Sequence, residues 1–415
     1  MKKKILKRLG YVLFAVIAIA AALAGYVQVD GIPKYKAEIP TDIHVEPTKE
    51  RVAQGKKLGE LLCVSCHLNK ETQRLTGSHI EDMPAEFGVV YSKNITQHPE
   101  RGIGKWTDAE LVYFLRTGIR PDGQYVPPWM IKLPHLSDED MFSIIAWLRS
   151  DDPRLAPTDV PPAGVTQPTF LAKALTHGVF GPLPYPKEPI ATPPKTDKIA
   201  YGRYLVFALD CYGCHSADFK SMNILEPEKT PGYMGGGNAI VGTDGHRIFT
   251  ANLTPDMETG IGTWSEKDFV RALRKGFRPD GRALHYPMLP KPELDDEDAS
   301  AIYNYLRSIP PIKNKVQRPQ PTVADRSGHP GKKLYAQYGC GGCHGAEGKG
   351  AVGDLRAANE HFPTDEALRA WIEDAPSLKP GTKMPAWKGT IKDEDYEPLM
   401  GYVRLLARPA KQAQN

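Results

Sequence analysis

The first feature of the chain is a long uncharged stretch near its N-terminus. Leu9–Val29 holds 21 residues without a charged side chain, and the residues before it, 2–8, are rich in lysine and arginine. A helix of that length rises about 31 Å, which matches the hydrocarbon core of a bilayer. Because basic residues stay on the cytoplasmic side, we expect one transmembrane helix with the rest of the chain outside. A cleaved signal peptide is the alternative, since Ala22-Leu23-Ala24 is a suitable cleavage site, but the apolar run continues past it to Val29.

Beyond residue 48 the apolar residues recur with helical spacing, and the pattern appears three times. Leu58, Leu61 and Leu62 stand at positions i, i+3 and i+4, so they share one face of a helix. Each of the three helices carries a glycine eight or nine residues ahead of a cysteine, where a partner helix can approach closely. These glycines are Gly55, Gly202 and Gly331.

Each repeat also ends in a helix with a shared charge pattern. Three consecutive acids are followed, seven positions after the last one, by an aromatic residue, and an arginine stands two positions further on. Acids in a first turn and a cation near a last turn suit the helix dipole. The helices begin at Asp138, Asp296 and Asp393, and their aromatic residues are Trp147, Tyr305 and Tyr402.

The first two repeats match over a longer stretch, at an offset of 158 residues. Thr107 with Glu110 predicts a capping box that begins a helix, and Gly118 predicts its end. Strand-like alternation is scarce, so we predict a mainly α protein. The matching segments are Asn94-Ile95-Thr96 with Asn252-Leu253-Thr254, Gly102–Trp106 with Gly260–Trp264, and the second capping box Ser265 with Asp268, ended by Gly276.

The net charge of +4 originates in the N-terminal segment, because residues 31–415 carry 48 basic and 48 acidic groups. A nucleic-acid-binding protein would show a basic surplus in its folded part, so that class is excluded. The 41% hydrophobic and 25% charged residues are those of a folded protein.

All six cysteines fall in one signature, C-x-x-C-H, which is the attachment pattern for haem c. Two thiols one helical turn apart can add to the two vinyl groups of one haem, and the adjacent histidine then becomes the proximal iron ligand. We therefore expect three covalently attached haem c groups. The signatures are Cys63, Cys66 and His67; Cys211, Cys214 and His215; and Cys340, Cys343 and His344.

Other uses of such cysteines fit the sequence less well. Disulfides do not require a histidine after each pair, and zinc sites need two pairs or a pair with two histidines. A thioredoxin-like motif would need a βαβ context, which is missing here.

Methionines are the expected sixth iron ligands. Met130 and Met288 are related by the same 158-residue offset, and Met384 also lies between a signature and a final helix. Met141 and Met400 lie on the terminal helices and are expected in the core. His135 and His285 remain rival ligands.

Two connectors rich in proline separate the repeats. Residues 153–196 hold eleven prolines in 44 positions, which predicts a semi-rigid, extended segment. Within it Thr169–Gly181 is apolar with helical spacing; it could dock a partner or touch the membrane, but we favour a role as cover for the joint between the first two repeats. The expected boundaries are 1–30 for the anchor, 49–152, 197–308 and 329–410 for the three domains, and 153–196 and 309–328 for the linkers.

With these motifs in place, the chain resembles the three-haem cytochrome c subunits of bacterial membrane-bound dehydrogenases that act on alcohols, sorbitol or gluconate. The likeness covers about residues 50–410, and the third repeat is similar to small class I cytochromes c in general. The resemblance implies three tandem class I cytochrome c-like domains, here preceded by one N-terminal transmembrane helix. Those subunits usually carry a cleaved signal, whereas this chain is expected to keep its anchor.

The function expected from these features is electron transfer and not catalysis. The resemblance implies a dehydrogenase catalytic subunit as donor and a quinone or terminal oxidase as acceptor, with the haem domains on the periplasmic side of the inner membrane. A haem enzyme of the peroxidase or nitrogen-oxide reductase type is the alternative, and it requires one open iron site. A membrane-tethered sensor would need a signalling domain, for which the short cytoplasmic segment leaves no room.

Overall fold

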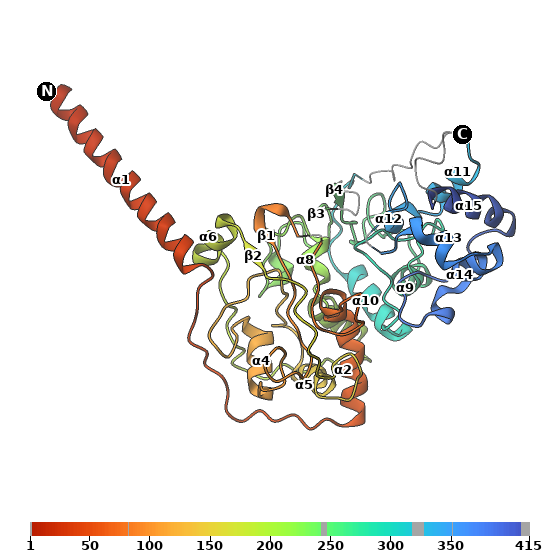
Figure 1. The fold of residues 1–415 in the computed structure, drawn as a ribbon, viewed down its shortest axis with the longest axis horizontal. Helices are drawn as coiled ribbons and strands as arrows, with labels where there is room; N and C mark the ends of the chain where they lie inside the picture. The colour runs from red at the N-terminus through yellow and green to blue at the C-terminus, as the bar shows by residue number, and fades with distance from the viewer. Residues whose placement is uncertain (1, 82, 242–246, 318–327, 351, 408–415) are drawn as a thin grey trace. The chain divides into compact units, whose positions relative to one another are not determined.

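The computed structural model describes residues 2–81, 83–241, 247–317, 328–350 and 352–407, and the chain divides into two units, Met1–Thr192 and Pro193–Asn415 (Figure 1). The described residues are mainly helical, as predicted. The strands among them form two short antiparallel ribbons. In one, β1 (Gly88–Val89) pairs with β2 (Gln167–Pro168); in the other, β3 (Ala239–Val241) pairs with β4 (Arg247–Phe249).

Helix α1 (Lys2–Asp30) contains the long uncharged stretch. Within its segment Lys7–Asp30 the most apolar window of 18 residues has a mean hydropathy of 2.3, and no part of that window is buried by other residues. The helix therefore projects from its unit (Figure 1). Its length and composition suit a membrane span, although a signal sequence has the same properties.

The rest of the first unit is built around two helices that cross, α2 (Lys49–Leu62) and α5 (Asp138–Leu148). The predicted capping box at Thr107 and Glu110 begins α4 (Asp108–Thr117), and Gly118 ends that helix in the left-handed conformation. Met141, at 0% exposure, lies in the core as expected. The remaining elements are α3 (Val64–His67), η1 (Ala85–Phe87) and α6 (Phe170–Gly178).

The second unit repeats this arrangement twice, and we call the three parts built around these helix pairs the first, second and third modules, in chain order. Helix α7 (Lys198–Ala208) crosses α10 (Asp296–Ser308), and α11 (Gly331–Gln337) crosses α15 (Asp393–Leu406). The second capping box, Ser265 with Asp268, begins α9 and Gly276 ends it, as predicted. The other elements are α8 (Cys211–His215), η2 (Pro227–Lys229), α9 (Glu266–Lys275), α12 (Gly341–His344), η3 (Leu355–Ala357), α13 (Ala358–His361) and α14 (Asp365–Leu378), which is kinked at Asp374.

The predicted close approach at the repeated glycines is confirmed at all three helix crossings. A methyl group added to each glycine would lie 1.7–1.9 Å from a backbone oxygen of the partner helix, far inside van der Waals contact. It would also lie 2.7–2.9 Å from the Cβ of the repeated aromatic residue of that helix. The three pairs are Gly55 with Trp147, Gly202 with Tyr305, and Gly331 with Tyr402.

Residues 153–192 of the proline-rich segment belong to the first unit. Its backbone bonds to the first module at several points: Leu75 N donates to Arg154 O at 3.0 Å, and Asp138 N donates to Ile190 O at 2.9 Å. Such bonds hold the segment along the module's surface. In the second connector, 309–328, residues 318–327 lie outside the described residues.

Candidate functional site

The three signatures share one local geometry. In each, the second cysteine and the histidine lie in a short helix, and the first cysteine stands at or just before its first turn. None of the six cysteines forms a disulfide, and all are half-buried. Both thiols of each pair and the histidine are therefore held within about one helical turn, as haem attachment requires. The three short helices are α3, α8 and α12.

Each signature histidine is oriented by a backbone carbonyl. Nδ1 of His67 donates to Lys93 O at 2.6 Å, and Nδ1 of His215 donates to Ala251 O at 2.8 Å. These two acceptors are themselves separated by the 158-residue offset. In the third module Nδ1 of His344 donates to Gly353 O at 3.0 Å. Because a carbonyl oxygen can only accept, the proton resides on Nδ1 and the lone pair on Nε2 is left for a metal.

Burial keeps these side chains neutral. It lowers the pKa of His67, His215 and His344, although the bond to the carbonyl opposes this shift in each case. Burial likewise raises the pKa of the thiols, to about 12 for Cys63, Cys211 and Cys340 and to about 11 for Cys343. Neutral imidazole is the form that binds iron.

Met130 and Met288 lie on corresponding loops, between α4 and α5 and between α9 and α10. An arginine closes each loop. Arg116 donates to Leu133 O at 2.7 Å and to Asp138 at 2.8 Å. Arg274, 158 residues later, donates to Leu294 O at 2.5 Å and to Asp296. These arginines fix the ends of the segment that carries each methionine.

The first loop has a further support in Lys132. Its Nζ donates to Pro127 O at 2.8 Å and to Met130 O at 2.9 Å. Burial lowers the pKa of this amine to about 7. The position that corresponds to Lys132 in the second module is Pro290, so there the loop is stiffened by a ring instead of by hydrogen bonds.

Met384 lies in the loop between α14 and α15 and packs on the hydrophobic core of the third module. Cys340 of the third signature packs on the same core. The structure thus brings a predicted attachment residue and a predicted iron ligand to one cluster. Met400, which was expected to be structural, is a buried member of that core.

The second and third modules share a wall, which we define as residues 277–288 of the second module. Ala283 N donates to Tyr338 O at 3.2 Å and Tyr286 N donates to Gly342 O at 3.3 Å. Phe277 packs edge-on against Trp387 with ring centroids 4.8 Å apart. The loop that carries Met288 therefore lies against the third signature.

Glycine at position 342 makes this contact possible. A methyl group there would lie 2.1 Å from Nδ1 of His285, the rival ligand in the shared wall. His285 therefore packs directly on the backbone of the third signature. The other rival, His135, lies just before α5 and is half-buried.

Four buried N–H groups lack a hydrogen-bond partner among the described residues. They are Nε of Arg120, Nε of Arg271, Nε1 of Trp387 and Nη2 of Arg404. An unpaired buried donor costs free energy, so such groups point to an acceptor that is supplied by a bound molecule. Haem propionates are acceptors of this kind, and N–H donors have the chemistry to bind them.

The repeated asparagines Asn94 and Asn252 could bind a haem propionate or hold a turn, and the structure shows both in local turns. Asn94 Oδ1 accepts from Thr96 N at 2.8 Å, and Asn252 Oδ1 accepts from Thr254 N at 2.9 Å. Both side chains cap local turns.

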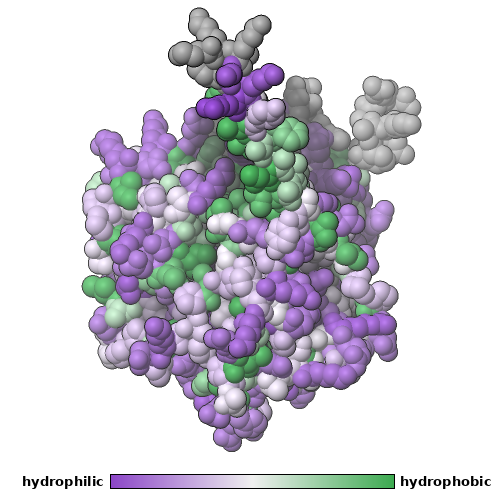
Figure 2. All heavy atoms as spheres, turned by 90° about the vertical axis from the view of Figure 1, so that its left-hand side faces the viewer, coloured by the Kyte–Doolittle hydropathy of each residue, from purple (hydrophilic) through white to green (hydrophobic). Residues whose placement is uncertain are grey.

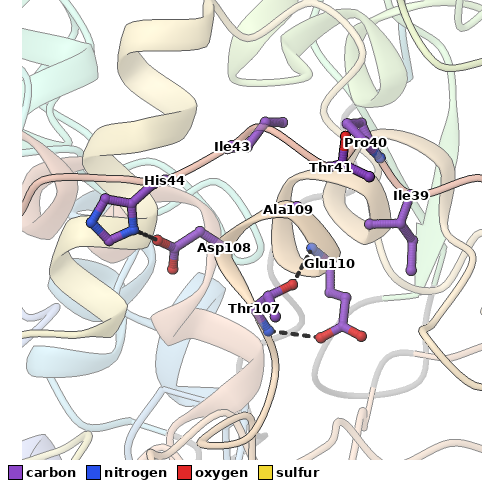
Figure 3. A pocket seen from close by; sticks show the side chains of 9 residues that line it. All are labelled: Ile39, Pro40, Thr41, Ile43, His44, Thr107, Asp108, Ala109 and Glu110. Atoms are coloured by element: carbon purple, nitrogen blue, oxygen red, sulfur yellow. Dashed lines mark hydrogen bonds and ion pairs between the residues drawn. The ribbon is translucent and has the colours of Figure 1, made fainter.

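A surface pocket of about 620 Å³ lies elsewhere in the first unit (Figure 3). It is formed where the chain segment 39–44 passes the start of α4. Asp108 there accepts from Val45 N at 3.0 Å and lies 3.6 Å from His44. None of the signature residues or predicted methionine ligands lines it, and its polar groups already cap α4, so we assign it no function.

The repeated crossing helices and the buried C-x-x-C-H segments define a protein composed of cytochrome c domains. Residues 199–310 match the family model for cytochrome c. Residues 326–403 match the model for cytochrome c oxidase, cbb3-type, subunit III.

Over most of its length the chain is homologous to cytochrome c subunits of bacterial dehydrogenases. It is 30% identical to that of the quinone alcohol dehydrogenase of Gluconacetobacter polyoxogenes, over 71% of this chain and 64% of that protein, so it spans less than two thirds of that relative. It is 29% identical to the fructose dehydrogenase cytochrome subunit of Gluconobacter japonicus, over 75% of this chain and 69% of that protein. It is 28% identical to the gluconate 2-dehydrogenase cytochrome c subunit of Pantoea cypripedii, over 84% of each.

Proposed function

We propose that the chain is a membrane-attached cytochrome with three covalently bound haem c groups that transfers electrons. The observation that carries this proposal is the Nδ1–carbonyl bond of each signature histidine, which leaves Nε2 for iron. A bound haem c supplies one-electron chemistry between Fe(II) and Fe(III). The relation to cytochrome c subunits of dehydrogenases supports a role in electron transfer and not in substrate turnover.

In this proposal the cysteine pairs would form the thioether bonds to each haem. His67, His215 and His344 would be the first iron ligands, and Met130, Met288 and Met384 would be the second. Methionine ligation raises the potential relative to ligation by two histidines. All three methionines are half-buried, and the loops that carry Met130 and Met288 are closed by Arg116 and Arg274.

We further propose that electrons arrive from a dehydrogenase catalytic subunit and leave toward a quinone or a terminal oxidase. The names of the relatives support the donor class. Helix α1 would anchor the chain in the inner membrane, and its basic N-terminal side would place the haem domains in the periplasm.

The number of attached haems is the direct test of the proposal. We expect mass spectrometry of the intact protein to find three haems on each chain, because each signature holds both thiols and its histidine in one turn. The double variant Cys340→Ala/Cys343→Ala should lose one haem and keep two. The matched control is Met257→Ala, at an exposed position, which should keep all three. A wild-type chain with fewer than three haems would contradict the proposal.

The anchor predicts where the mature protein is found. Because α1 is of spanning length and is not covered by protein, we expect the mature chain to remain in the membrane fraction after a high-salt wash. N-terminal sequencing should begin at or near Met1. A mature chain that begins at Gly25 would show that the segment is a signal peptide.

A further inference from the structure

Helix α6 has buried residues on one side and exposed apolar side chains in its first turn and just past its end. Ala172 and Thr176, one turn apart, are buried against the first unit. The side chains of Phe170 and Leu171 are 48% and 47% exposed. The side chain of Val179, just past the helix, is 66% exposed. Large apolar side chains that remain exposed along one short helix indicate a surface that another phase or molecule covers.

The helix is fastened beside the point where α1 ends. The ring of His177 packs against Tyr26 with centroids 5.6 Å apart, and its Nε2 lies 3.0 Å from Gly31 O. Lys173 Nζ donates to Gln28 Oε1 at 3.3 Å. Figure 1 shows α6 next to the lower end of α1, within the same unit.

The position of α6 beside the end of α1 indicates what covers its exposed apolar side chains. The uncharged stretch of α1 ends at Val29, so a spanning α1 leaves the hydrocarbon at the level of its contacts with α6. Tyr26 stands where aromatic residues gather at membrane interfaces. Figure 2 shows this side of the molecule, with hydrophobic residues along the projecting helix and near its base. A helix at that level with outward apolar side chains meets the lipid headgroups and the upper acyl chains.

We propose that α6 is an interfacial helix that inserts Phe170, Leu171 and Val179 into the outer surface of the bilayer. It would give the first module a second membrane contact beside α1. A domain held at two points has a fixed tilt relative to the membrane, whereas a domain held by one anchor can rotate about it. The proposal rests on the proposed function only in that α1 remains in the mature chain and the six native thiols are consumed by haem.

Site-directed spin labelling of the full-length holoprotein tests the proposal. If all native cysteines form thioethers, Leu171→Cys supplies the only reactive thiol for a nitroxide label. The labelled protein is placed in vesicles of phosphatidylethanolamine and phosphatidylglycerol, without partner subunits. The matched control is Leu225→Cys, because Leu225 has the same exposure of 47% and lies in the second unit. Val179→Cys provides a second reporter should the first variant label poorly.

The readout is the collision rate of each label with oxygen, which dissolves in lipid, and with a water-soluble nickel complex. At position 171 we expect the oxygen-to-nickel ratio to be at least about fivefold higher than at position 225. Equal ratios would overturn the proposal, and so would shielding of position 171 from both reagents, because that pattern indicates a protein cover. More than one label per chain would instead show incomplete haem attachment, which separates failure of the proposed function from failure of this inference.

Discussion

Replacing Met384 with alanine is expected to convert one haem of three from six-coordinate low-spin iron to an open site. Met384 is the only methionine between the third signature and α15, and it packs on the same core as Cys340. Loss of its sulphur leaves the sixth position to water, which is a weaker ligand. We expect the Met384→Ala protein to bind one equivalent of carbon monoxide in its reduced form, where the wild type binds none rapidly. Absorption and magnetic resonance spectra of the purified holoprotein measure both changes.

The control variant is Met257→Ala, because the Met257 side chain is 64% exposed. It should retain three low-spin haems. Met384→His should restore six coordination with a lower potential for that haem, since imidazole replaces the thioether. A Met384→Ala protein whose three haems all remain low-spin would refute the assignment, and stoichiometric carbon monoxide binding by the wild type would favour the haem-enzyme alternative.

Replacing Gly55 with alanine should strongly destabilise the first module. Helix propensity alone predicts that this change raises the free energy of unfolding by roughly 0.5–1 kcal/mol. The crossing with α5 reverses the sign, because the new methyl group would lie 1.7 Å from Ser143 O. Separating two packed helices to relieve such a clash costs about 3 kcal/mol, which corresponds to a fall in melting temperature of about 10 °C or more for a module of this size. Circular dichroism of the holoprotein during heating measures the shift.

Gly178→Ala is the matched control for that experiment. Gly178 ends α6 with ordinary backbone angles, and no atom lies within 4 Å of the position of an added methyl group. Its substitution should change the free energy of unfolding by less than about 0.5 kcal/mol. Equal melting curves for the two variants would mean that the crossing at Gly55 is looser than the structure indicates.

Features that depend on local chemistry could be predicted from the sequence. The capping box at Thr107 and Glu110 and the left-handed glycine at 118 involve residues within a few positions of one another, so their pattern is visible in the chain. The close approach at Gly55 could also be predicted, because glycine weakens a helix and is therefore favoured inside an apolar helix face only where a neighbouring backbone leaves no room for a side chain.

Features that depend on backbone atoms or on distant contacts could not be predicted. The acceptors of the signature histidines are carbonyl oxygens, which every residue possesses, so nothing marks Lys93 or Ala251 in advance. The burial of Arg116 could not be predicted from the sequence either, since arginine is usually exposed. The 158-residue offset relates Arg116 to Arg274 and was the one available signal for the paired loop closures.

The wall shared by the second and third modules has a consequence for protein engineering. Phe277 and Ala283 are buried members of the core that also contains Tyr335, Trp387 and Tyr402. A fragment cut at the second connector would lack both side chains and would expose the apolar surface that they cover. A chimeric redox protein that carries the third module with its core complete would therefore have to include the chain from Phe277 onward.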